Sequence, residues 1–189
     1  SHAEGYTTIA GGDYSHAEGH LTKASGVYSH AECDATIASG TASHAEGWTT
    51  TASGGQSHAE GAGTNAGGDQ SHAEGYLTIA SGTNSHAEGA STIASGTTAH
   101  AEGVNTRAGG VSSHAEGDNT IASGLRSHAE GNDTAASGDD SRHVSHRPWI
   151  SGCSSTGGGP GQRGGKILER KVKTLKVHAR APYRDLPCP

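Results

Sequence analysis

Small and polar residues alternate along most of the chain in a unit of 14 residues, which recurs ten times from residue 1 to residue 140 without a change of register. The unit reads S-H-A-E-G-x-x-T-x-A-[S/G]-G-x-x, and only Cys33 and Ala99 break its strong Ser and Gly positions. Alternation over five residues is typical of a strand, and glycine followed by two variable residues suits a tight corner. Each unit therefore predicts two short strands and two corners, which together form one coil of a solenoid.

The two faces of these predicted strands differ in chemistry. Only small side chains fit between two strands in so flat a coil, so we expect the Ser, Thr, Ala and Gly positions to face the interior. The His and Glu of the first strand then point to its other face, and the ninth and eleventh places of the unit point outward from the second strand. The ninth place varies from Ile9 to Lys23 and Arg107, which indicates contact with solvent. The His–Glu face does not vary, so we expect something to pack against it.

The composition excludes an ordinary globular enzyme, because only 30% of the 189 residues are hydrophobic. Residues 1–140 contain only 16 Ile, Leu, Val, Trp and Tyr residues, far fewer than an isolated domain of this size needs. Ten identical copies of a pattern also argue for a structural material and against a single active site, so no catalytic residue is predicted. Association through the invariant face is the expected compensation, which predicts a homo-oligomer.

At these positions the sequence resembles the YadA-like head of trimeric autotransporter adhesins, whose unit is S-V-A-I-G-x-x-S-x-A-x-G-x-x. The match covers residues 1–140, and in the first unit it rests on Ser1, Ala3, Gly5, Thr8, Ala10 and Gly12. The resemblance implies an all-β, left-handed parallel β-roll of ten coils in which three chains wind about one axis. It also implies display on the bacterial cell surface and attachment to host or extracellular-matrix molecules.

This chain departs from that family where Val and Ile are replaced by His and Glu. Units with S-H-A-E-G also resemble the shafts of phage and prophage tail fibres and spikes, which is the alternative function. We predict that these side chains form a structural ladder at the trimer axis, because buried charges are usually paired. The ladder comprises His2, Glu4, His16, Glu18, His30, Glu32, His44, Glu46, His58, Glu60, His72, Glu74, His86, Glu88, His100, Glu102, His114, Glu116, His128 and Glu130.

Each imidazole of the ladder is expected to hydrogen-bond a carboxylate in its own or a neighbouring chain. A carboxylate beside an imidazole favours the protonated ring, so we expect a raised pKa for these His residues. Metal binding is an alternative, since His and carboxylates are good ligands and three chains would converge on an ion. The pattern lacks the helical H-E-x-x-H arrangement, so no metal ligand and no cofactor is assigned.

Two further surfaces are candidate binding sites. The Thr column from Thr8 to Thr134 suggests an ice or crystal binder, but a flat outer Thr array is missing because the ninth column is chemically mixed. The variable corners are better placed for ligand contacts, and their exposed aromatic candidates are Tyr6, His20, Trp48 and Tyr76. No shared motif in the corners identifies the ligand.

The pattern fails after Asp140, where charge and composition also change. Residues 1–140 carry 3 Lys or Arg and 17 Asp or Glu, whereas residues 141–189 carry 10 and 2 and all five Pro. We expect residues 141–189 to be a flexible basic tail or a non-native continuation, with residues 166–177 as a short helix or strand. The basic run lacks interleaved aromatics, so no nucleic-acid partner is predicted.

Cysteines and apolar segments add little to this picture. Cys33, Cys153 and Cys188 are too scattered to predict a disulfide framework or a zinc motif. No apolar run approaches the 18 residues of a membrane span, and no leader pattern precedes the repeats. Surface display is therefore expected from the resemblance alone.

Overall fold

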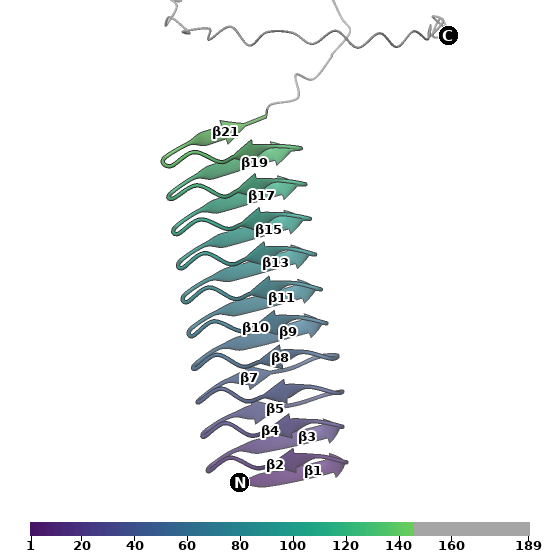
Figure 1. Ribbon diagram of the computed structural model, residues 1–189. Coiled ribbons are helices and arrows are strands. Elements are labelled where there is room, and N and C mark those ends of the chain that lie inside the picture. Colours follow the sequence, from purple (N-terminus) through teal and green to yellow (C-terminus); the bar gives the residue numbers. More distant parts are fainter. Residues whose placement is uncertain (146–189) are drawn as a thin grey trace, which may run out of the picture. The chain divides into compact units, whose positions relative to one another are not determined.

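The computed structural model describes residues 1–145, which form a parallel β-solenoid of 14-residue coils without any helix in that range. Figure 1 shows the coils stacked as a column, with each coil contributing one strand to each of two sheets. None of the described residues forms a helix that is long and apolar enough to cross a membrane. The predicted fold class is confirmed in its parallel coils and their length.

The first sheet has eleven strands in chain order. They are β1 (His2–Tyr6), β3 (His16–His20), β5 (His30–Ala31), β7 (His44–Ala45), β9 (His58–Ala62), β11 (His72–Tyr76), β13 (His86–Ala90), β15 (His100–Val104), β17 (His114–Asp118), β19 (His128–Asn132) and β21 (Arg142–Val144). The second sheet has ten strands. They are β2 (Ile9–Ala10), β4 (Lys23–Ala24), β6 (Ile37–Ala38), β8 (Thr51–Ala52), β10 (Asn65–Ala66), β12 (Ile79–Ala80), β14 (Ile93–Ala94), β16 (Arg107–Ala108), β18 (Ile121–Ala122) and β20 (Ala135–Ala136).

Backbone hydrogen bonds join each coil to the next in strict register. His72 pairs with His86 and Glu74 with Glu88, so each residue lies beside the residue 14 positions later. In the second sheet the Ile79 N–H donates to the Thr92 carbonyl at 2.9 Å. Equivalent positions therefore form straight columns along the whole stack.

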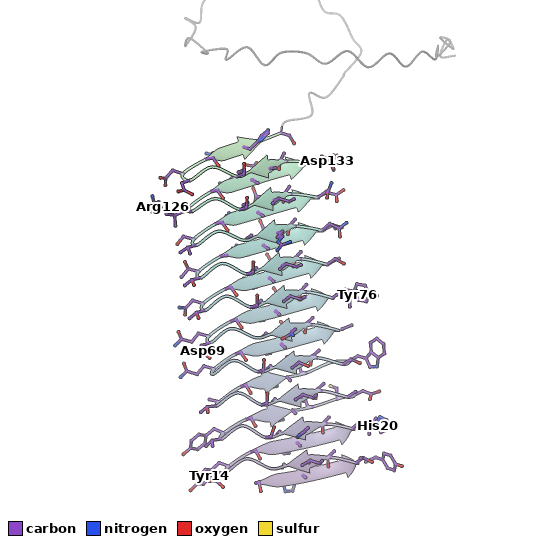
Figure 2. All side chains as sticks on the ribbon, viewed as in Figure 1. Tyr14, His20, Asp69, Tyr76, Arg126 and Asp133 are labelled. Atoms are coloured by element: carbon purple, nitrogen blue, oxygen red, sulfur yellow. The ribbon has the colours of Figure 1, made fainter. Side chains whose placement is uncertain are left out.

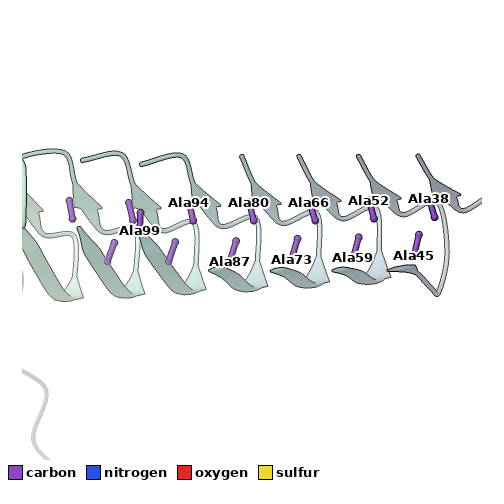
Figure 3. Packing of buried hydrophobic residues seen from close by; sticks show 14 of the residues in the cluster. Ala38, Ala45, Ala52, Ala59, Ala66, Ala73, Ala80, Ala87, Ala94 and Ala99 are labelled. Carbon is purple, nitrogen blue, oxygen red and sulfur yellow. The ribbon is translucent and has the colours of Figure 1, made fainter. Parts of the chain in front are cut away.

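The core consists of small side chains, as predicted. The two Ala columns of the coils from Ala17 to Ala136 are at most 3% exposed, and they face one another between the two sheets (Figure 3). Ser and Thr of the first and eighth places are buried beside them. The ninth place is mostly exposed, which confirms that the second strand points it toward solvent.

The two strands of a coil are less alike than the half-repeat predicts. The first strand usually spans five residues, whereas the second spans only two. The second ends early because two successive N–H groups share one carbonyl: Ser81 N and Gly82 N both donate to the Ala94 oxygen, at 2.9 and 3.3 Å. This bulge stops the regular ladder and turns the chain into the corner.

Cys33 shows why the fifth place is otherwise glycine. Gly89 has φ of 102°, and a Cβ built there would lie 2.2 Å from the Gly103 carbonyl oxygen. Cys33 adopts a φ of 79° at the same place. In that coil β5 shrinks to two residues, as does its neighbour β7, so the side chain disturbs the local pairing.

The first sheet continues beyond Asp140. Strand β21 pairs in register with β19, with His128 opposite Arg142 and Glu130 opposite Val144. Ser141 keeps the corner of a normal coil, since its hydroxyl donates to the Gly138 oxygen at 2.6 Å. The predicted flexible tail is expected to begin at residue 141, but residues 142–144 form a strand. From residue 146 on, the expectations for the tail, for residues 166–177 and for Cys153 and Cys188 lie outside the described residues.

Candidate functional site

The invariant His and Glu side chains form one continuous row on the outer face of the first sheet. Period-two geometry puts both on the face opposite the buried Ala, and stacking repeats them in every coil. From His16 to His114 successive imidazole rings lie 4.8 to 4.9 Å apart and within 7° of parallel. The stack loosens at its ends, where the ring planes of His114 and His128 are 85° apart. We call the ten His and ten Glu side chains on this face the His–Glu row.

From His30 to His128, each His of the row contacts the Glu of the preceding coil. The distance from His Nε2 to Glu Oε1 is 3.2 Å for His44 and Glu32, and it widens to 4.0 Å for His128 and Glu116. The structure therefore builds the pairs within a single chain and between coils. The location of this row at a trimer axis stays a prediction.

Most imidazoles of the row are poorly satisfied by these contacts. Within the described part of the chain, the Nε2 atoms of seven His residues are buried and have no hydrogen-bond partner: His16, His30, His72, His86, His100, His114 and His128. Their side chains as a whole are still about one third exposed, as the 36% of His86 illustrates. A buried nitrogen without a partner costs free energy, so the row is poised for another ligand or for another chain.

The Glu residues line a shallow groove beside the imidazole stack. It has a volume of about 700 Å³ and is lined by Glu and Gly of five successive coils, from β11 to β19. The glycines leave the groove floor without side chains, which exposes the carboxylates along its length. The groove is therefore an acidic surface that runs parallel to the stack.

Neighbouring carboxyls of the groove shift one another's pKa. Hydrogen bonds with Glu116 and Glu88 raise the pKa of Glu102 to about 7. The pKa of Glu74 is raised in the same way, chiefly by a hydrogen bond with Glu88. In contrast, a hydrogen bond with Glu102 lowers the pKa of Glu88. A proton on every second carboxyl relieves the repulsion between like charges.

The raised His pKa expected from the sequence is wrong for two members of the row. Burial lowers the pKa of His100, and the charges of His114 and His86 lower it further. Burial also lowers the pKa of His114. The sequence showed the carboxylate beside each ring but gave no sign that each ring also stacks between two others.

The aromatic candidates are exposed, and Figure 2 shows two of them, His20 and Tyr76, at one edge of the column. Tyr6, Trp48 and Tyr76 are 71%, 59% and 55% exposed. His20 stacks on Tyr6 with ring centroids 5.4 Å apart, and its Nδ1 lies 2.9 Å from Asp34 Oδ1. All four candidates belong to the corner that follows the first strand.

Sequence reasoning missed the contacts at the opposite corner. Tyr14 and Tyr28 stack there with centroids 5.1 Å apart, and Arg126 Nε donates to Asp140 Oδ1 at 2.6 Å. Both pairs are 14 residues apart, so the repeat itself could have identified them. Exposed side chains at this corner therefore pair along the stack.

The chemistry of the row is that of a repeated ligand surface. Triads such as His58, Glu60 and His72 bring two imidazoles and one carboxylate together, with ligand atoms within 4.8 Å of one another. Every coil repeats the same groups, so the row is one long surface and not one centre. No protein-family model and no curated protein matches this chain. The resemblance to adhesin heads accordingly stays a prediction based on the residues.

Proposed function

We propose that this chain is the head module of a homotrimeric protein displayed on the bacterial cell surface, with an adhesive role and no reaction of its own. One observation carries this proposal: the His–Glu row is the same in ten coils, yet it is only partly covered in the single chain. Copies of the same chain are the partner that supplies a matching row in every coil. The three-chain state comes from the resemblance to adhesin heads.

A shared axis also accounts for the chemistry of the row. Three carboxylates in one layer would repel one another unless donors lie beside them. The buried Nε2 atom of His86, which makes no hydrogen bond within the described residues, is such a donor when it carries a proton. Packing three rows together would exclude water from the groove and satisfy these nitrogens.

Adhesion is assigned to the corner that carries Tyr6, His20, Trp48 and Tyr76. Large exposed aromatics are the residues that most often anchor a binding partner. The corner differs in every coil, whereas the His–Glu row does not, which fits a variable binding surface on a constant scaffold. A host extracellular-matrix protein or another surface molecule is the expected ligand.

A trimeric shaft of a phage or prophage tail fibre is the second candidate. The unbroken 14-residue register from β1 to β21 favours it, because a uniform stack suits a rigid spacer. A shaft needs the same trimer but no ligand at the corners. Oligomeric state therefore tests what the two functions share, and ligand binding separates them.

The oligomeric state of the full chain is the first test. Light scattering should give three times the chain mass of 18.9 kDa. The double variant His72→Glu/His86→Glu adds negative charge to the acidic row and should give the mass of one chain. Ile79→Glu/Ile121→Glu adds two carboxylates to the exposed second sheet and should leave the trimer intact. A well-folded wild-type monomer would overturn the proposal.

Binding to immobilised collagen, fibronectin and laminin tests the adhesive role. Trp48→Ala/Tyr76→Ala should reduce binding at least tenfold, whereas Tyr14→Ala/Tyr28→Ala removes the aromatic pair of the opposite corner and serves as the control. A trimer that binds none of these proteins would contradict a matrix-binding head and favour the shaft.

A further inference from the structure

We propose that the His–Glu row binds divalent transition-metal ions such as zinc, each held by the Nε2 atom of one His and the carboxylate of the Glu in the preceding coil. Both ligands belong to one chain. The inference therefore stands apart from the trimer and from the adhesive role.

In three pairs of the row the spacing of the two ligand atoms fits a metal ion better than a hydrogen bond, whereas His44 with Glu32 and His58 with Glu46 are close enough to hydrogen-bond. The Nε2–Oε1 distances are 3.4 Å for His72 and Glu60, 3.4 Å for His86 and Glu74, and 3.6 Å for His100 and Glu88. Good hydrogen bonds between nitrogen and oxygen are about 2.7–3.2 Å long. Two ligands that each lie about 2.0–2.1 Å from a tetrahedral zinc are separated by roughly 3.3–3.4 Å. An ion therefore fits between these atoms with little movement.

The buried state of the nitrogens is a second and independent observation. Nε2 of His72, His86 and His100 is buried and makes no well-formed hydrogen bond within the described residues, although each atom lies 3.4 to 3.6 Å from a carboxylate oxygen. A bound cation would occupy this gap and satisfy both groups at once.

The remaining ligands are constrained by the imidazole stack. The lone pair of Nε2 lies in the ring plane, and rings that are parallel and 4.9 Å apart do not direct two lone pairs at one point. One His per ion is therefore the natural number within one chain. A second carboxylate is available, as His128 shows: its Nε2 lies 3.4 Å from Glu130 and 4.0 Å from Glu116. The adjacent groove has room for water as a further ligand.

Repulsion between ions limits how many can bind. The described residues contain eight His–Glu pairs between coils, and successive rings of the regular stack lie 4.8 to 4.9 Å apart. Divalent ions in neighbouring coils would compete for the same carboxylates and repel one another. We expect occupation of every second coil, which corresponds to about four ions per chain. Imidazole with carboxylate suits zinc, nickel or copper, whereas magnesium and calcium prefer oxygen ligands alone.

This inference goes beyond the expectation from the sequence, which assigned no metal ligand because a helical motif is absent. Strands provide another route to the same chemistry. Alternation puts His and Glu on one face, and stacking by 14 residues brings His86 of one coil beside Glu74 of the coil before it.

Metal binding by the full chain tests the inference. After treatment with EDTA and dialysis, the chain is titrated with zinc chloride, and bound ions are counted by equilibrium dialysis. We expect about four ions per chain at neutral pH, and no comparable binding of magnesium. The variant Glu46→Gln/Glu60→Gln/Glu74→Gln/Glu88→Gln removes the carboxylates of half of the eight pairs and leaves two neighbouring pairs on either side. Each side then holds one ion, so the variant should bind about two ions. Glutamine preserves side-chain size, and circular dichroism reports whether the sheets persist.

A matched control comes from the corner. His20 and Asp34 form a His–carboxylate pair of 2.9 Å outside the row, so His20→Gln should not change the number of bound ions. Cobalt separates the row from the cysteines of the chain, because thiolate ligation adds a strong near-ultraviolet band that imidazole and carboxylate do not give. An unchanged ion count in the fourfold variant, or a wild-type cobalt spectrum without ligand-field bands, would overturn the inference. If the chain is a monomer that binds zinc, the metal inference holds and the proposed trimer is overturned. If it is a trimer that binds no zinc, the trimer holds and the metal inference is overturned.

Discussion

At the scale of single residues, the buried Thr side chains differ between coils in their hydrogen bonding. Thr78 is fully buried, and its hydroxyl has no hydrogen-bond partner among the described residues. Thr36 is equally buried, but its hydroxyl donates to the Glu32 carbonyl at 3.0 Å. Thr36 follows Cys33, whose coil has the shortened strand β5. The same side chain is therefore satisfied in one coil and unsatisfied in another.

Replacing these two Thr residues by Val should give opposite effects on stability. Thr78→Val removes a buried hydroxyl without a partner and keeps the side-chain shape, so we expect stabilisation by about 1 kcal/mol. Thr36→Val leaves the Glu32 carbonyl without its donor and should destabilise by about 1 kcal/mol. Chemical denaturation of both variants measures the difference. Equal effects of the two substitutions would show that the hydroxyl of Thr78 finds a partner.

Corner residues present a different local problem, because most residues at the seventh and fourteenth places have positive φ. Thr49 has φ of 57°, although a β-branched side chain disfavours this region. Thr49→Asn should stabilise the protein by about 0.5–1 kcal/mol, since Asn tolerates the left-handed region better. Thr51→Asn makes the same change in strand β8 and should be neutral or destabilising. Thermal melting of both variants checks this, and a stabilising effect of Thr51→Asn would point to a general surface effect instead.

Residue burial was predictable from the sequence, whereas backbone conformation at the corners was not. Alternation correctly assigned Ala73 to the interior and Ile79 to the surface, because side-chain direction in a strand follows directly from period two. The positive φ of Leu77 and Gln70 carries no such signal, since neither residue is typical of that region. The chain accepts these conformations because the stacked coils on both sides impose them.

At the scale of the strands, glycine sets how closely the coils can approach. A Cβ at Gly82 would lie 2.0 Å from the Gly96 carbonyl oxygen of the next coil. Gly67, one place earlier in its unit, has no atom nearer than 3.5 Å to such a Cβ. Serine occupies that eleventh place in most units, whereas the twelfth place is always glycine. At the twelfth place the backbones of neighbouring coils are therefore in direct contact, whereas at the eleventh place there is room for a side chain.

Alanine substitutions at these two places should distinguish the effect of a clash between coils from the general effect of replacing a glycine. Gly82→Ala pushes neighbouring coils apart and should destabilise by about 3 kcal/mol or more. Gly67→Ala restricts the unfolded chain without a clash and should be neutral or stabilising by about 0.5 kcal/mol. Denaturant midpoints of the two variants provide the measurement. A mild effect of Gly82→Ala would mean that the coils can separate locally without loss of pairing.

Strand number and register followed from the repeat, but strand length did not. The 14-residue period fixes which residues lie side by side, and every pairing obeys it. The shared Ala94 carbonyl that ends β12 depends on backbone hydrogen bonds between coils, which leave no mark on the side-chain pattern. Likewise, the sequence identified the members of the His–Glu row but not the burial and the neighbouring imidazoles that lower the pKa of His100.

At the scale of the whole stack, the row couples groups with opposite responses to pH. Glu102 has a folded pKa of about 7, above its usual value of 4.5, so its contribution to stability is complete below pH 4.5 and is lost as pH rises toward 7. Glu88 and His100 have lowered pKa values in the folded chain. Their contributions are present above their ordinary pKa values and are lost as pH falls. Opposing slopes therefore cancel in part, and the wild-type chain should vary little in stability between pH 5 and 7.

Single Gln substitutions should reveal the two opposite changes of stability with pH that cancel in the wild-type chain. Glu102→Gln removes a carboxyl that destabilises the stack once it ionises, so its melting temperature should rise relative to wild type as pH increases from about 4.5 to 7, and then stay level. Glu88→Gln removes a favourable carboxylate, so this variant should be less stable than wild type near pH 7 and converge with it in acid. Melting curves of the three proteins across pH 4–8 decide the matter. Parallel curves would show that the carboxyls titrate independently, and the alternation of protons along the groove would then be wrong.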